Sequence, residues 1–292
     1  LLSGGSGAVL PPDHALQQQD WLVVLQLQQW QQENRISRAV SVNPDDILSD
    51  WQQELSWTER TGWDDKTAAF LSEQQLCFGQ CILQKRSSDK LPTSEQKLQA
   101  WLGYIRRHGL DILPWEDHSR QFLARLSLVK QHYPEDGWPD SSAATLLAEL
   151  EQWLGPYLSN VGKSQQLQQL PLHDALLARL SYEQNRQLQE LAPTHWQAPT
   201  GSRLSIDYQA ENGPLLSVRI QEVYGQMRSP AILQGRLPLT MALLSPSRQP
   251  LQLTRDLASF WQNTWQDVKK EMKGRYPKHY WPDDPAVAVP TT

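Results

Sequence analysis

The sequence is poor in cysteine, with only Cys77 and Cys81 among its 292 residues. Four positions along a strand span about 13 Å, which exceeds the roughly 7 Å limit between the Cα atoms of a disulfide. A structural zinc site needs four ligands at a recognisable spacing, so this pair lacks two partners. We therefore expect two buried free thiols.

A basic excess is also missing. The 27 Lys and Arg are outnumbered by 32 Asp and Glu, which gives a formal net charge of −5. Domains that coat nucleic acid usually carry a positive excess, because neutralised phosphates supply most of their affinity. Any contact of this chain with nucleic acid must therefore come from a local patch.

Long apolar runs are absent as well. The longest, WLVVLQL at 21–27, has the length of a strand, whereas a membrane-spanning helix needs roughly 18 apolar residues. The sequence has neither an initiating Met nor a signal peptide with a basic start and an apolar middle. We expect a cytoplasmic protein without a membrane partner, and the first residues, LLSGGSGAVL, suggest a piece of a longer chain.

Tryptophan, by contrast, is abundant. The 13 Trp supplement an apolar fraction of 39%, because each large ring buries more area than an aliphatic side chain. We expect folded domains with a real core, and the length favours two or three of them.

Strand patterns dominate the first ninety residues. Segments 21–28 and 34–42 can pair as a hairpin. Further strands are predicted at 51–57, 66–72 and 76–84, with turn signals such as TGWDD between them. Five short strands of this length suit a small barrel or a curled sheet.

The apolar period becomes helical from about residue 93. Thr93 can cap a helix, with Gln96 placed for the reciprocal bond, and Gly109 marks the stop. Further helices are predicted at 122–129, at 146–154 with a stop at the Gly-Pro pair 155–156, at 173–180 and at 181–191.

Strand patterns return after residue 195, at 203–209, 215–225, 237–245 and 250–256. The last element is predicted as one amphipathic helix that ends at Gly274 as its C′ residue. Its apolar stripe consists of Leu257, Phe260, Trp261, Trp265, Val268 and Met272.

Catalytic motifs are not convincing. GPYLSNVGKS at 155–164 has six residues between Gly155 and Gly162, whereas a Walker phosphate loop needs four before its Gly-Lys pair. GGSGA at 4–8 ends in Ala8, so it misses the nucleophile-elbow pattern. Paired aspartates, such as Asp45 and Asp46, lie in predicted turns or caps.

The segment KGRYPKHYWPDDP at 273–285 admits two interpretations. Its cations could hold phosphates while its aromatic rings stack on unpaired bases. Alternatively, its Tyr-Pro and Trp-Pro pairs hold an extended strap against the last helix, since prolines reduce the entropy of the free segment. Asp283 and Asp284 would weaken a phosphate site. We favour a strap whose rings pack inward and whose cations form a basic outer edge.

Several long stretches resemble a known family. LAPTHWQAPTGSRLSIDY (191–208), DLASFWQNTW (256–265) and KGRYPKHYWPDDP (273–285) resemble the C-terminal signature of the bacterial HrpB-type DEAH-box helicases. LLSGGSGAVLPPD (1–13) and GLDILPWEDHSRQFLARL (109–126) resemble upstream stretches of the same region, so the resemblance covers essentially the whole chain. In such helicases two RecA-like domains, a winged-helix domain and a ratchet-like helical domain precede this region.

The resemblance and the patterns together predict an α+β fold. Residues 1–90 would form a small OB-like β-barrel, and a fragment can lack its first strand. Residues 91–195 would form a central helical region. Residues 196–292 would form a C-terminal β-sheet with a terminal amphipathic helix.

No Walker A loop, Asp-Glu-Ala-His box or arginine-finger motif is present, so no catalytic residue of the family is carried over. The resemblance implies that ATP and Mg²⁺ bind in the helicase core of the longer protein, and we expect no cofactor in this chain. It would be an accessory C-terminal region, without ATPase activity of its own, that assists nucleic-acid binding and braces the core. The implied partners are single-stranded RNA or other nucleic acid, and the RecA-like, winged-helix and ratchet domains of the same polypeptide.

The alternative is a protein-interaction scaffold with little affinity for nucleic acid, which the net negative charge, the glutamine-rich helices and the many Trp favour. Under the first hypothesis the candidate nucleic-acid contacts come from two cationic stretches, QKRSSDK at 84–90 and KKEMKGRYPK at 269–278, with the rings that follow. They are Lys85, Arg86, Lys269, Lys270, Lys273, Arg275, Lys278, His279, Tyr280 and Trp281.

Overall fold

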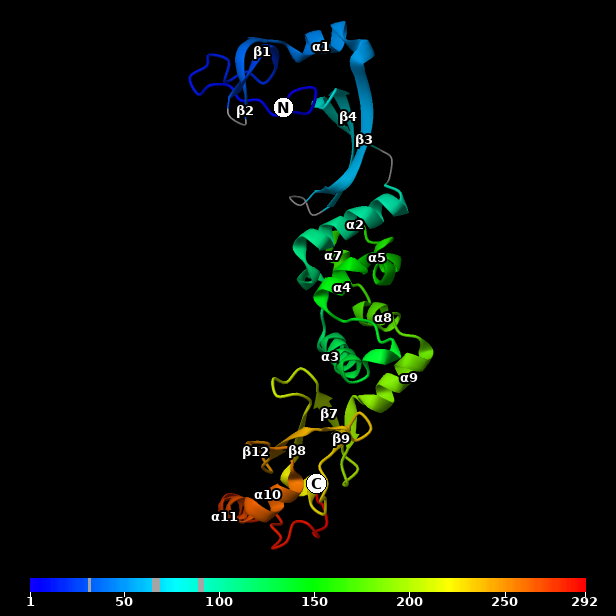
Figure 1. Ribbon diagram of the computed structural model, residues 1–292, viewed down its shortest axis with the longest axis vertical. Coiled ribbons are helices and arrows are strands. Elements are labelled where there is room, and N and C mark those ends of the chain that lie inside the picture. The colour runs from blue at the N-terminus through cyan, green and yellow to red at the C-terminus, as the bar shows by residue number, and fades with distance from the viewer. Residues whose placement is uncertain (31–32, 65–68, 89–91) are drawn as a thin grey trace. The chain divides into compact units, whose positions relative to one another are not determined.

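The computed structural model describes residues 1–30, 33–64, 69–88 and 92–292. The chain divides into two compact units (Figure 1). The first unit comprises Leu1–Tyr104 and Leu158–Leu167, and the second Ile105–Tyr157 and Gln168–Thr292. Helices and strands occur in both units, which confirms the α+β class. The division into 1–90, 91–195 and 196–292 stays a prediction.

Two open sheets make up the strands of the first unit. β1 (Leu22–Trp30) pairs antiparallel with β2 (Glu33–Ser41), as the hairpin prediction required. β3 (Leu55–Asp64), β4 (Ala69–Phe78) and β5 (Cys81–Ser87) form a separate antiparallel sheet in that order. Among the described residues no ladder joins the two sheets, so the strands do not close into the expected barrel.

A helix that was not predicted precedes one predicted strand, and a 3₁₀ turn replaces the start of that strand. Asn43 accepts a hydrogen bond from the Asp45 amide at 3.1 Å and begins α1 (Pro44–Asp50). Asparagine at the cap and proline at the first position both favour a helix. A 3₁₀ turn (Gln52–Glu54) follows, so the predicted strand 51–57 begins only at Leu55. The start of the predicted strand 66–72 lies outside the described residues.

The predicted strand 76–84 is a hairpin. Gly79 has φ +58° and divides it into the end of β4 and the start of β5. A Cβ atom at Gly79 would lie 2.3 Å from the Ser3 carbonyl oxygen, so this turn requires glycine. Cys77 and Cys81 therefore flank a turn and do not lie along one strand. Both are free thiols; Cys77 is buried, as expected, but Cys81 is only half-buried.

The capping prediction at residue 93 is confirmed. The Thr93 amide donates to Gln96 Oε1 at 2.9 Å, and the Gln96 amide donates to Thr93 Oγ1 at 3.2 Å. These bonds begin α2 (Ser94–His108), and Gly109 ends it with φ +83°. Within the first unit, the buried Trp101 donates its indole N–H to the Val161 carbonyl at 2.8 Å.

Helices make up the middle of the chain, and most of them are short. The predicted helix 146–154 is interrupted, because Glu149 leaves the helical region with φ −90° and ψ 11°. The predicted stop at Gly155 is wrong, because another short helix begins at that residue. The helices are α3 (Asp117–His132), α4 (Ala143–Ala148), α5 (Leu150–Trp153), α6 (Gly155–Leu158), α7 (Ser164–Leu167), α8 (Leu172–Leu177) and α9 (Tyr182–Leu191). None of the described helices is long and apolar enough to cross a membrane.

A five-stranded sheet in the order β12-β11-β8-β7-β6 organises the C-terminal part. Its strands are β6 (His195–Gln197), β7 (Arg203–Asp207), β8 (Leu215–Arg219), β11 (Thr240–Leu244) and β12 (Pro250–Thr254). β8 and β11 run parallel and the other pairs antiparallel. β9 (Ala231–Ile232) and β10 (Leu237–Pro238) pair separately. The predicted strand 215–225 is shorter, because a 3₁₀ turn (Ile220–Val223) follows Arg219.

Two helices cover this sheet where one was predicted (Figure 1). α10 (Leu257–Asn263) and α11 (Trp265–Arg275) are separated at Thr264, and Asn and Thr are weak helix formers. Gly274 lies inside α11 and Tyr276 is the C-cap, so the predicted stop at Gly274 is wrong. The buried core between sheet and helices includes Val218, Met241, Leu243, Leu257, Phe260, Trp261, Trp265 and Met272.

Candidate nucleic-acid interface

The segment after α11, residues 276–285, is fastened to the second unit as a strap. Side chains of the core bind its backbone: Trp265 donates its indole N–H to the Pro282 carbonyl at 3.1 Å, and the Tyr224 hydroxyl donates to the Tyr280 carbonyl at 3.3 Å. The Gly225 amide donates to the Pro285 carbonyl at 2.8 Å. The prediction of a strap is therefore confirmed, but Tyr280 is 53% exposed, so not all of its rings pack inward as expected.

Aromatic rings pack beneath the strap. The Trp265 ring lies 5.6 Å from the Tyr224 ring and 6.1 Å from the Trp281 ring, measured between centroids. Burial raises the pKa of the Tyr224 hydroxyl, which therefore stays protonated and acts as the donor to the strap. Trp281 is only 8% exposed, and its indole N–H donates to the Tyr276 carbonyl at 2.9 Å. Its ring is occupied in packing and has no open face for a base.

One of the predicted cations also fastens the strap. Lys269, whose side chain is 15% exposed, forms an ion pair with Asp283. A hydrogen bond from Lys269, followed by its charge and that of Lys273, holds the pKa of Asp283 below its ordinary value. Arg275 is exposed and pairs with Glu271 at 3.4 Å. The charge of Lys269 is thus committed to the fold, and that of Arg275 is partly compensated.

The remaining cations face solvent. Pro277 begins a turn that is closed by the His279 amide donating to the Tyr276 carbonyl at 3.2 Å, and Lys278 and His279 lie exposed in it. Lys270 and Lys273 are exposed on the last turns of α11. In the described part of the chain, no carboxylate lies within 4 Å of the Lys270, Lys273 or Lys278 ammonium groups. Tyr280 is 53% exposed beside them.

The second candidate stretch lies in the first unit, on β5. Lys85 pairs with Glu73 at 3.5 Å. The Arg86 guanidinium lies over the Trp57 ring, 4.0 Å from its centroid, and donates from Nε to Gln74 Oε1 at 2.8 Å. Trp57 is 42% exposed and was not predicted, because its position beside Arg86 depends on the register of β3, β4 and β5. Asp89 and Lys90 of the same stretch lie outside the described residues.

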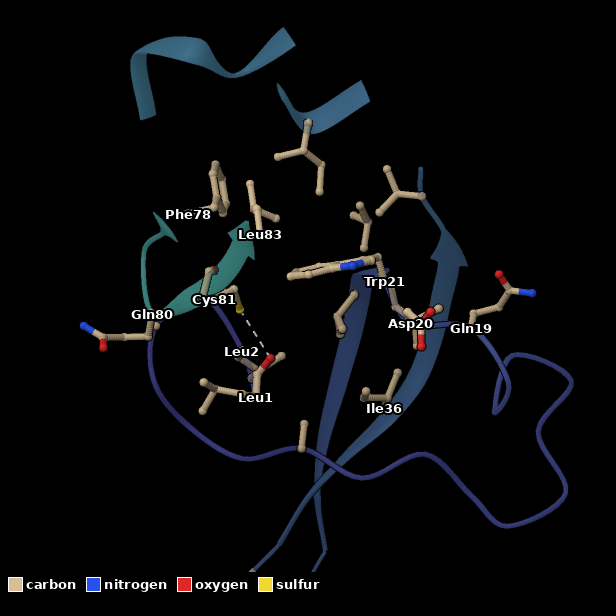
Figure 2. Close-up of a pocket in the computed structure, with 18 of the residues that line it drawn as sticks. Leu1, Leu2, Gln19, Asp20, Trp21, Ile36, Phe78, Gln80, Cys81 and Leu83 are labelled. Carbon is tan, nitrogen blue, oxygen red and sulfur yellow. Dashed lines mark hydrogen bonds between the residues drawn. The ribbon is translucent and has the colours of Figure 1, made fainter. Parts of the chain in front are cut away.

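A cavity of about 1020 Å³ lies elsewhere in the first unit. Figure 2 shows the Trp21 ring inside it, with Leu1 and Leu2, Ile36 of β2, and Phe78 and Leu83 around it. The Cys81 thiol donates to the Leu1 carbonyl at 3.5 Å. The described residues that line the cavity include Asp20, Asp46 and Asp50 but no Lys or Arg. The aspartates of the cavity would repel a phosphate group, whereas its apolar side chains suit an apolar partner.

Candidate metal ligands do not cluster in the described residues. Within residues 1–30, 33–64, 69–88 and 92–292, no group of three or more His, Cys, Asp or Glu is placed to hold a metal ion. The candidate binding groups among the described side chains are therefore the cations and exposed aromatic rings of the strap and of β5.

The comparisons with known proteins agree on one family. The HrpB_C family model, ATP-dependent helicase C-terminal, matches residues 153–285. The "ATP-dependent RNA helicase HrpB" of Escherichia coli (strain K12) is 38% identical over 292 residues, which cover 99% of this chain and 36% of that protein.

Two solved structures from E. coli give the same result. The chain matches the "DExH-box NTPase HrpB" with a TM-score of 0.69 and 38% identity, over 99% of this chain and 36% of that one. It matches the "DEAH/RHA helicase HrpB" with a TM-score of 0.61 and 35% identity, over 96% of this chain and 35% of that one. The chain thus spans about a third of the length of these relatives.

Proposed function

The chain belongs to the HrpB-type ATP-dependent helicases and corresponds to their C-terminal region, and from this premise we propose that it is an accessory part of such an enzyme. It assists nucleic-acid binding, with single-stranded RNA as the ligand, and braces the helicase core. ATP and Mg²⁺ belong to the RecA-like domains of the longer polypeptide, and this region has no ATPase activity of its own. The OB-like character of residues 1–90 is part of the same proposal.

One observation carries the nucleic-acid role: α11 and the strap expose Lys270, Lys273 and Lys278, and among the described residues no carboxylate lies within 4 Å of their ammonium groups. Lys270 and Lys273 are three residues apart and share one face of α11. Lys278 follows in the turn that the Tyr276 carbonyl closes. Because the backbone beneath these side chains is already ordered, phosphate binding loses less conformational entropy there than on a free tail.

Exposed aromatic rings offer stacking contacts to bases, and these contacts do not depend on the base sequence of the RNA. The Tyr280 ring is 53% exposed and packs edge-on against Tyr224 at 6.2 Å, which leaves ring surface for a base. In the first unit, Trp57 and Arg86 offer a ring and a planar cation together. Stacking on such groups contributes about 1–3 kcal/mol per base in single-strand binding proteins.

The experiment that tests this proposal removes the three lysines that have no carboxylate within 4 Å in the described part of the chain. We expect a variant with Lys270, Lys273 and Lys278 changed to Ala to bind single-stranded RNA more weakly. The slope of log K against log salt should flatten by about 2 units, since each single-strand phosphate contact contributes about 0.7. Fluorescence anisotropy of a labelled RNA at several salt concentrations measures both quantities.

The matched control changes the same three lysines to Arg, which keeps the charges and should keep the slope. A slope that is unchanged in the alanine variant would remove these three lysines from the binding surface. An equal loss in both variants would point to damaged packing instead of lost charge.

A protein-interaction scaffold is the second candidate, and the cavity of the first unit favours it. Its described lining residues include three aspartates and no Lys or Arg, and Val23, Leu25 and Val40 of the β1–β2 hairpin are exposed. The partner would be the other domains of the same polypeptide. The scaffold hypothesis would be supported if those domains retain the chain after RNase treatment and the chain binds no RNA.

A further inference from the structure

A loop distant in sequence lies against the base of the strap. The loop between β11 and β12 is closed by the Arg248 amide donating to the Ser245 carbonyl at 2.9 Å and by the Ser245 amide donating to the Gln249 carbonyl at 2.8 Å. The Tyr276 hydroxyl forms a hydrogen bond with Ser247 Oγ and lies 3.5 Å from Ser245 Oγ. The loop is therefore held beside the last residue of α11 and the first residue of the strap.

Arg248 occupies an unusual backbone conformation in this loop. Its φ is +63°, in the left-handed region that glycine adopts freely and that residues with a Cβ atom adopt at a cost. In hairpin loops of this kind the left-handed position is usually glycine. Strained positions of this type concentrate at functional sites, and the side chain of Arg248 is exposed.

Cationic residues flank Tyr276, which the loop of Arg248 contacts. Ser247, its neighbour in the chain, touches Tyr276, which is followed by the turn with Lys278 and His279 and preceded by Arg275. The Tyr276 ring lies 6.1 Å from the His279 ring. Among the described residues, Arg275 has an ion-pair partner in Glu271, and none is found for Arg248.

We propose that Arg248 is a further phosphate contact for single-stranded nucleic acid, on the same surface as Lys278 and Arg275. The inference rests on the proposed function, and it extends the interface from the strap to the β11–β12 loop. Arginine suits this place because its planar guanidinium binds a phosphate through two parallel hydrogen bonds. The strained backbone fixes where that side chain leaves the loop.

The test uses the opposite effects of one substitution on stability and on binding. Arg248→Gly relieves the left-handed backbone, so we expect the melting temperature to rise by a few degrees, about the shift that a relieved strain of this size gives. The same variant should bind single-stranded RNA about 3- to 10-fold more weakly, with a salt slope flatter by about 0.7. A residue with a purely structural role would not move the two readouts in opposite directions.

Two further variants complete the experiment. Arg248→Lys keeps a charge and should retain most of the salt slope. Arg186→Ala removes an exposed arginine that is already paired with Glu183 at 2.7 Å and Glu190 at 3.3 Å, and it should leave RNA binding unchanged.

The outcomes separate this inference from the proposed function. Unchanged binding by Arg248→Gly, together with a flatter slope in the triple lysine variant, would overturn the role of Arg248 and leave the function standing. Unchanged slopes in both variants would overturn the function and the inference with it. A loss of affinity in Arg248→Gly at an unchanged slope would also overturn the inference, because a phosphate contact must alter the slope.

Discussion

Changing Trp265 to Ala is expected to lower the free energy of unfolding of the second unit by about 3–5 kcal/mol, the range for large aromatic side chains removed from a core. Trp265 is fully buried between the sheet and the strap. Its ring contacts Tyr224, Trp261 and Trp281, and its indole N–H is the donor to the Pro282 carbonyl. The substitution removes packing and a fastening bond of the strap together.

Urea unfolding followed by circular dichroism measures this loss. The control is Tyr182→Ala, because Tyr182 is 87% exposed at the start of α9 and its removal should change the free energy of unfolding by about 0.5 kcal/mol or less. Limited trypsin digestion should also become faster at Lys273 and Lys278 in the Trp265 variant alone. A loss below about 1 kcal/mol would show that the packing of strap and sheet does not depend on this ring.

Changing Arg125 to Met is expected to lower the free energy of unfolding of the same unit by about 2–3 kcal/mol, because buried carbonyl groups lose a charged donor. Arg125 is 3% exposed on α3. Its Nε–H donates to the Ala192 carbonyl at 2.6 Å, and Nη2 lies 3.4 Å from the Leu188 carbonyl and 3.0 Å from Gln189 Oε1. The guanidinium thus binds the carbonyl end of α9, where a cation is also favoured by the helix dipole.

Methionine keeps much of the aliphatic volume, so the variant isolates the loss of the hydrogen bonds. Burial lowers the pKa of Arg125, yet a guanidinium stays charged at every accessible pH, so the effect should not vary between pH 5 and 8. Hydrogen exchange should speed up at the end of α9. Arg186→Met, on the exposed face of the same helix, serves as the control, and equal stability of the two variants would contradict the role of Arg125.

Local signals explain which elements could be predicted. The Thr93–Gln96 cap, the stop at Gly109 and the β1–β2 hairpin depend on residues close in sequence, and all three are confirmed. The missed helix α1 and the break at Thr264 have local causes, whereas another error arises where the deciding contact is distant. Position 79 of the β4–β5 turn requires glycine because the Ser3 carbonyl lies against it, a proximity that the sequence spacing does not reveal.

In the candidate site, too, local features could be predicted and tertiary contacts could not. Its prolines and aromatic residues predicted a strap, but the partners of its cations depend on tertiary structure. Lys269 forms an ion pair with Asp283, and the Trp281 ring packs against the Trp265 ring. The loop that holds Arg248 contacts Tyr276 through Ser247, which lies 29 residues earlier in the chain. A linear pattern therefore identified the segment but not which of its side chains remain available.

The most direct measurement is the binding of a labelled single-stranded RNA to this chain, by fluorescence anisotropy, between about 50 and 200 mM salt. The account predicts micromolar affinity at low salt and a slope of log K against log salt of about −2 to −3, from three or four phosphate contacts at about 0.7 each. No binding at the lowest salt would contradict it and would leave nucleic-acid recognition to other domains of the helicase.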